Sequence, residues 1–196
     1  MTRSMTGIAA AVALASALAC ASDKPMSPRE VSIPLFDRMG GENNLGTHLN
    51  GDGEVPARPS QGQGQAIFRI SDDGQSVEYK LIAANIDNVF MAHIHIAGPG
   101  VNGPIVEWLF PGTAAVPGPT GAGRFEGVLV TGTFTAANLV GPLAGHPLSD
   151  LLRLMRNDSA YVNFHTNDGV GATNTGPGDF PGGEIRGQLA APGNKM

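Results

Sequence analysis

Three histidines have the side-chain type and the spacing that metal chemistry needs. His93 and His95 are two residues apart in the apolar segment 89–96, and His165 lies in the later apolar segment 161–166. Residues two apart in a β-strand point to the same side, so Met91, His93 and His95 should form one row. Three imidazoles suit copper or zinc, and a thioether favours copper. The sequence therefore predicts a copper site with His93, His95, His165 and Met91 as ligands.

The other faces of the same two segments are apolar. Ala92 and Ile94 alternate with the first two histidines, and Val162 and Phe164 flank Asn163 in the later segment. Both strands would then carry their histidines away from the core, which predicts a surface-accessible site. A second interpretation stays open, in which the histidines hydrogen-bond backbone carbonyls of glycine-rich loops and only order the fold.

Common catalytic motifs are missing from the sequence, which has no G-x-S-x-G elbow, no G-K-[ST] phosphate loop and no H-E-x-x-H. Residues 98–103 match G-x-G-x-x-G, but Pro104 and the strand-like segment 105–110 follow where a helix would have to begin. We interpret these glycines as a tight connection between two strands. The prediction leans toward a protein that is not an enzyme.

Composition excludes several functional classes. The net charge of −5 comes without a block of lysines and arginines, so we expect no nucleic-acid binding. The single cysteine, Cys20, excludes an internal disulfide framework and a cysteine-rich zinc finger. The 28 glycines and 15 prolines, with only 15% charged residues, favour short strands joined by many turns.

The strand-like segments lie after residue 49. Asp73-Gly74 separates the alternating segments 66–70 and 77–81, which predicts a hairpin. The other expected strands are 89–96, 105–110, 125–134, 161–166 and 184–189. Glu184 and Arg186 share one face of the last strand, and we interpret them as a structural ion pair, either with each other or with polar side chains of loop 167–179.

One segment has the period of a helix. Apolar residues at i, i+3, i+4 and i+7 would form its buried stripe: Leu148, Leu151, Leu152 and Met155. Asp150 lies near the positive end of this helix, and Arg153 and Arg156 lie near the negative end. Several strands with one helix predict an all-β fold, an antiparallel sandwich or barrel with one short helix.

The N-terminus has the pattern of an export signal. Thr2 and Arg3 precede an apolar run, Ile8–Ala19, which is too short to span a membrane. We expect a signal peptide over residues 1–22. Ala19 before Cys20 also resembles the lipobox of bacterial lipoproteins, in which the cysteine is acylated, and ordinary cleavage near Ala19 or Ala21 is the alternative. Membrane contact is expected only through such a lipid anchor.

The remaining divisions of the chain follow from composition. Residues 23–47 have little periodicity and are predicted to be a linker, residues 48–190 to be the folded domain, and residues 191–196 to be a C-terminal tail. We expect an extracytoplasmic protein, which is periplasmic, secreted or an outer-membrane lipoprotein.

Several motifs resemble the CHRD (chordin) domain as it occurs in bacterial exported proteins. They are Glu54-Val55-Pro56, Ala92-His93-Ile94-His95-Ile96, Asn102-Gly103-Pro104-Ile105-Val106, Tyr161-Val162-Asn163-Phe164-His165-Thr166 and Pro181-Gly182-Gly183-Glu184-Ile185-Arg186-Gly187-Gln188. The resemblance implies a Greek-key-like sandwich or barrel, immunoglobulin-like or superoxide-dismutase-like. It brings no assigned chemistry, because fold alone does not determine function.

Two functions are compatible with these features. The first is a noncatalytic exported binding module of the cell envelope, whose partner is an unknown protein or envelope ligand. The alternative is a copper-binding protein or a copper redox enzyme, because the His-x-His strand also resembles the copper-binding strand of copper/zinc superoxide dismutases. The chain lacks the zinc-loop histidines and the disulfide of those enzymes, so full dismutase activity is not expected.

Overall fold

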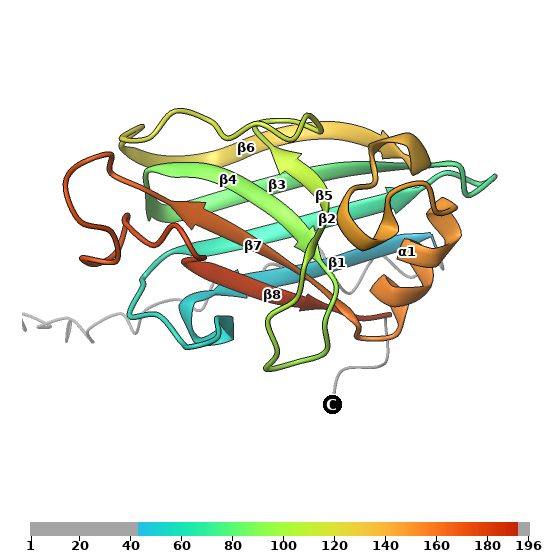
Figure 1. Cartoon of the computed structure of the whole chain (residues 1–196), viewed down its shortest axis with the longest axis horizontal. Coiled ribbons are helices and arrows are strands. Elements are labelled where there is room, and N and C mark those ends of the chain that lie inside the picture. Colours follow the sequence, from blue (N-terminus) through green and yellow to red (C-terminus); the bar gives the residue numbers. More distant parts are fainter. Residues whose placement is uncertain (1–42, 192–196) are drawn as a thin grey trace, which may run out of the picture. The chain divides into compact units, whose positions relative to one another are not determined.

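The fold is known from a computed structural model that describes residues 43–191 (Figure 1). The expected signal peptide, the lipobox cysteine, most of the expected linker and nearly all of the C-terminal tail lie outside these residues. Within residues 43–191, no helix is long and apolar enough to cross a membrane.

Eight antiparallel strands form the domain, which confirms the all-β prediction. They are β1 (Asn44–Asn50), β2 (Gln63–Ile70), β3 (Ser76–Asp87), β4 (Val89–His95), β5 (Ile105–Phe110), β6 (Arg124–Thr135), β7 (Ala160–Thr166) and β8 (Ile185–Leu189). The helices are α1 (Leu148–Arg156) and the 3₁₀ turns η1 (Gly51–Gly53), η2 (Ala136–Asn138) and η3 (Gly141–Leu143).

The strands follow the order β5-β4-β7-β8-β1-β2-β3-β6 in one sheet that folds back on itself. Its two halves are joined where β8 meets β1, through the single residue pair Asn50 and Arg186. Strands β3 and β6 pair although two strands separate them in the sequence, and so do β4 and β7. In both pairs a strand lies beside the third strand that follows it in the sequence. This is the pairing of a Greek key, in which the fourth strand returns to lie beside the first.

The core lies between the two halves and is built by strand alternation. Val77, Tyr79 and Leu81 of β3 are buried, whereas Glu78 and Lys80 between them are exposed. The expected hairpin is present, since β2 pairs with β3 along its whole length and Gly74 adopts a φ of 66° in the turn.

Helix α1 lies at one end of the strands (Figure 1). Its buried residues are the predicted stripe of Leu148, Leu151, Leu152 and Met155. Asp150 lies in its first turn and Arg153 and Arg156 in its last, as expected. This helix was therefore predictable from its sequence period alone.

The first strand begins earlier than the sequence pattern indicated. Residues 44–47 belong to β1, although they were expected to be linker. Leu45, Thr47 and Leu49 of β1 are buried in alternation, but the glycine and histidine between them and the asparagines at both ends hide the pattern. Seven residue pairs with β2 hold this strand in place.

Candidate metal centre

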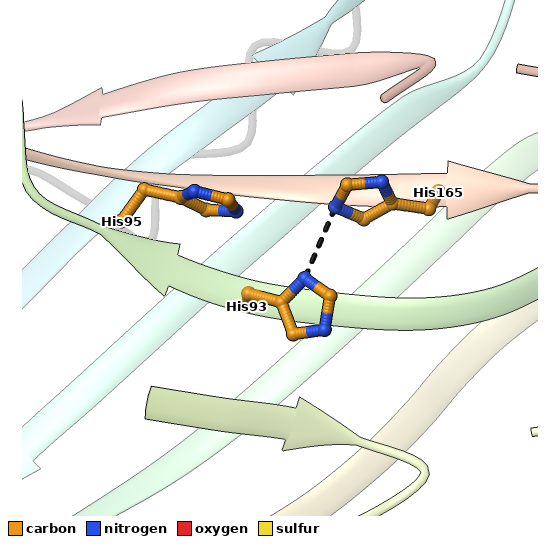
Figure 2. A group of neighbouring side chains, drawn as sticks. All are labelled: His93, His95 and His165. Atoms are coloured by element: carbon orange, nitrogen blue, oxygen red, sulfur yellow. Dashed lines mark hydrogen bonds between the residues drawn. The ribbon is translucent and has the colours of Figure 1, made fainter. Parts of the chain in front are cut away.

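Two neighbouring strands bring the three histidines together. Strands β4 and β7 are antiparallel, with His93 opposite Asn163 and His95 opposite Tyr161. His165 stands opposite Met91 in the same register. The alternation prediction is confirmed, because the rings share one face of the sheet while Ala92 and Ile94 lie in the core. Figure 2 shows the three rings turned toward one another.

The distances between the rings approach those of shared metal ligands. One ligand atom from each of the three histidines lies within 4.8 Å of the others. His93 Nδ1 and His165 Nε2 are 3.1 Å apart. Nitrogens bound at about 2.05 Å to one tetrahedral ion lie about 3.3 Å apart, so the most distant pair needs an approach of roughly 1 to 1.5 Å.

Backbone carbonyls orient two of the rings. His95 Nδ1 lies 2.9 Å from the carbonyl oxygen of Gly103, and His165 Nδ1 lies 2.9 Å from that of Pro181. A carbonyl only accepts, so each Nδ1 carries the proton and each Nε2 keeps a lone pair. This is the arrangement in which a metal-binding histidine donates its other N–H to a backbone carbonyl.

The connection between β4 and β5 supplies one of these carbonyls. It contains the G-x-G-x-x-G match and no helix, which confirms the strand-connection interpretation. A Cβ at Gly103 would lie 2.0 Å from the carbonyl oxygen of Ile96, so only glycine allows this close approach. The tight loop therefore fixes the carbonyl that orients His95.

The prediction of a surface-accessible site is wrong. Only 0%, 7% and 6% of His93, His95 and His165 are exposed. Strand alternation indicates the face on which a side chain lies, but it does not indicate what covers that face. Here the cover includes the loop that carries Gly103 and the segment that carries Pro181.

Burial keeps the three imidazoles neutral. It lowers the pKa of His93 to about 2 and that of His165 to about 4, with a further lowering from neighbouring histidines. The pKa of His95 is also lowered, mainly by burial. The Nε2 atoms of His93 and His95 are buried and have no hydrogen-bond partner among the described residues. Neutral rings with free lone pairs are the form that binds metal ions.

Aromatic side chains hold the rings in position. The Trp108 ring contacts His93 edge-on, with centroids 4.2 Å apart. Tyr161 stacks on His95 at 4.8 Å and an angle of 8°. The Arg186 guanidinium lies 3.4 Å from the centroid of the Tyr161 ring. These contacts restrict the rotation of two of the three rings.

Glu184 and Arg186 do not pair with each other, so the first of the two alternatives for this pair is wrong, and Glu184 instead contacts the backbone of loop 167–179. Glu184 accepts hydrogen bonds from Ser60, Thr166 and the backbone of Gly178. Arg186 bonds to other groups: Asn102, Gln188 and the carbonyls of Gly98 and Val101. The two side chains therefore fasten different loops, and no ion pair joins them.

Two polar residues beside the histidines escaped the sequence-based prediction. Asn163 lies on the same strand face as His165, and its Oδ1 is 3.0 Å from His165 Nε2. Glu54, which precedes the first long loop, is 6% exposed and lies beside Asn163. The period of β7 indicated the position of Asn163, but no local signal could place Glu54 there.

Comparison with known families completes the description of the site. Residues 45–189 match the model of the CHRD domain family, and the chain belongs to this family. The match contains all three histidines and the eight strands except for the first residue of β1. No curated protein and no solved structure matched the chain.

Proposed function

We propose that this protein is an exported, noncatalytic CHRD-domain module of the cell envelope that binds copper through His93, His95 and His165. One observation carries the proposal. Three buried and neutral imidazoles converge within 4.8 Å, and two of their Nε2 atoms have no hydrogen-bond partner among the described residues. Buried polar atoms without partners are uncommon and unfavourable, and a cation bound in the cluster would satisfy the lone pair of His95 Nε2.

A purely structural role explains less of the arrangement. Hydrogen bonds to the carbonyls of Gly103 and Pro181 do order two rings, as the second interpretation expected. They use only the Nδ1 atoms, however, and they aim the Nε2 atoms of His95 and His165 toward the cluster. Ordering a loop does not require three imidazoles at one point.

Copper is preferred over zinc by general affinity. Divalent copper lies above zinc in the affinity order of nitrogen-donor sites, and imidazole suits both ions. The sequence-based prediction also included the thioether of Met91, but the site proposed here consists of the three histidines. Met91 is half-buried. It lies opposite His165 in the register of β4 and β7, two residues before His93.

Burial of the histidines supports binding without catalysis. His93 is fully buried, and the other two rings are nearly so. A substrate would need an open coordination position, as in catalytic metal sites. The apolar run Ile8–Ala19 supports export, and Cys20 supports a lipid anchor in the envelope.

Calorimetric titration with copper and with zinc tests the proposal. We expect the wild type to bind one equivalent of copper more tightly than zinc, and the variant His93→Ala/His95→Ala to lose at least about 100-fold in copper affinity because two of three imidazoles are gone. Trp108, the only tryptophan, contacts His93 and should report binding through its fluorescence.

The matched control is His48→Ala, because His48 is exposed on β1 and is not one of the clustered histidines. Its copper affinity should equal that of the wild type. Equal affinity in the wild type and the double variant would refute the site, and tighter binding of zinc would refute copper as the ion.

A further inference from the structure

The amide of Asn163 lies beside the histidine cluster. Asn163 is 3% exposed on β7, directly opposite His93 on β4. Its Oδ1 lies 3.0 Å from His165 Nε2, which in turn lies 3.1 Å from His93 Nδ1. A carbonyl oxygen therefore joins the same group of buried donor atoms.

The surroundings of His165 contain one acceptor too many. Its Nδ1 faces the carbonyl oxygen of Pro181, and its Nε2 faces Oδ1 of Asn163. A neutral imidazole has one N–H, so it can donate to only one of these oxygens. In the neutral ring, the other contact sets two lone pairs against each other.

Glu54 lies beside the amide nitrogen of Asn163. The Nδ2 of Asn163 and the Oε1 of Glu54 both border the space beside Gly183, although no hydrogen bond joins them and Glu54 Oε1 has no hydrogen-bond partner among the described residues. The Nδ2 of Asn163 therefore lies on the Glu54 side of the amide, and its Oδ1 lies on the His165 side.

A glycine makes room for this contact. Gly183 adopts a φ of 123°, and a Cβ there would lie 2.4 Å from Glu54 Oε1 and 2.9 Å from Asn163 Nδ2. Any other residue would push the carboxylate and the amide apart. The backbone of this loop thus admits the carboxylate beside the amide.

We propose that Asn163 Oδ1 is a fourth ligand of the ion held by His93, His95 and His165, and that this set of three nitrogens and one oxygen selects a divalent ion over Cu(I). The inference rests on the proposed function and goes beyond it. A cation between His165 Nε2 and Asn163 Oδ1 turns two opposed lone pairs into two ligand bonds.

The fourth ligand determines which oxidation state is favoured. An amide oxygen is a hard donor and suits divalent ions, whereas the thioether of Met91 would favour Cu(I). Glu54 then acts as the outer partner that orients the oxygen ligand, a role whose loss typically lowers metal affinity by about 10- to 100-fold. Ligation by Asn163 therefore predicts a preference for Cu(II), whereas ligation by Met91 predicts a preference for Cu(I).

The test compares Asn163→Ala with Met91→Leu in the full-length chain. Cu(II) and Zn(II) affinities are measured by competition titration, and Cu(I) affinity by competition with a Cu(I)-specific chelator. We expect Asn163→Ala to lower Cu(II) and Zn(II) affinity by about 10- to 100-fold and to change Cu(I) affinity less than threefold. Met91→Leu should leave all three affinities unchanged.

A rescue variant separates ligation from packing. The double variant Asn163→Asp/Glu54→Gln keeps an oxygen ligand at position 163. The amide that can donate a hydrogen bond moves to position 54, and the carboxylate that can accept it moves to position 163. Its Cu(II) affinity should return to within about threefold of the wild type. We expect this because the loss of affinity in Asn163→Ala comes from the missing oxygen ligand and not from altered packing. X-ray absorption of the wild-type zinc complex gives a readout without mutation, and it should show nitrogen and oxygen neighbours but no sulfur.

The outcomes distinguish this inference from the proposed function. Wild-type copper binding that Asn163→Ala leaves unchanged, or a sulfur neighbour in the absorption spectrum, would overturn the fourth ligand and leave the three-histidine site standing. Absence of binding by the wild type would end both proposals. A failure of Asn163→Ala to fold leaves the absorption spectrum to decide.

Discussion

Burial sets the protonation of the side chains that matter in this domain, and the histidines are not the only case. Glu107 of β5 is fully buried and pairs in register with the core residue Ile94. Neither of its carboxyl oxygens has a hydrogen-bond partner among the described residues. Burial raises its pKa to about 9, so the neutral acid is the form at pH 7. Burial, and to a smaller extent Glu107, raises the pKa of Tyr79 to about 12.

This buried acid predicts that the domain loses stability as pH rises. The native carboxyl binds its proton up to about pH 9, whereas the unfolded one releases it near its ordinary value of 4.5. The native state therefore binds more protons between these values, and the free energy of unfolding falls with pH across that window. Glu107→Gln should remove this fall and add about 3 to 6 kcal/mol at pH 8.

Chemical denaturation at pH 5, 7 and 8.5 measures the effect of Glu107→Gln. Glu78→Gln is the control, because Glu78 is exposed on β3 and should leave the pH profile unchanged. Parallel pH profiles for the wild type and Glu107→Gln would show that this carboxyl ionises normally.

Single side chains also mark the limit of prediction from sequence. Strand period placed His93, His95 and His165 on one face, and the structure confirms that face. Their burial depends on loops that arrive from distant parts of the chain, so no local pattern could show it. For the same reason Glu54, more than 100 residues before Asn163, could not be assigned to the site.

At the scale of elements, helix α1 is predictable because its signal is local. Its apolar stripe packs against the core through four buried residues, and Leu152 is 4% exposed. Leu152→Ala should destabilise the domain by about 2 to 5 kcal/mol, the usual cost of removing a buried leucine side chain. Thermal or urea unfolding measures this change.

The control for this helix is Ser149→Ala on its exposed side, which should change stability by less than about 0.5 kcal/mol. A loss near zero for Leu152→Ala would mean that the helix contributes no packing energy.

Strand β1 shows the opposite case, an element whose signal is not local. Its apolar positions Leu45 and Leu49 alternate correctly, but asparagine and glycine lower its strand propensity. Pairing with β2 supplies what the segment lacks by itself. Strands of this kind can be predicted from sequence only when their pairing partner is known. This explains why the sequence-based prediction began the domain at residue 48, after most of β1.

At the scale of the molecule, β1 connects the two halves of the sheet. It pairs along its length with β2 and meets β8 through Asn50 and Arg186. The metal-site strands β4 and β7 lie in the half that contains β8. Loss of β1 would therefore open the core and separate the half that carries the histidines from the other half.

Two fragments test this role of β1. Residues 43–191 contain every described element and should melt cooperatively and bind copper like the full chain. Residues 49–190 lack most of β1, including the buried Leu45 and the pairing partners of five β2 residues. The loss of a buried leucine alone costs about 2 to 5 kcal/mol, and total stabilities are about 5 to 15 kcal/mol. We expect the shorter fragment to show no cooperative transition by circular dichroism, because a sandwich with an open edge beside its core cannot offset that loss. Equal melting temperatures for the two fragments would show that β8 and β2 hold the halves together without β1.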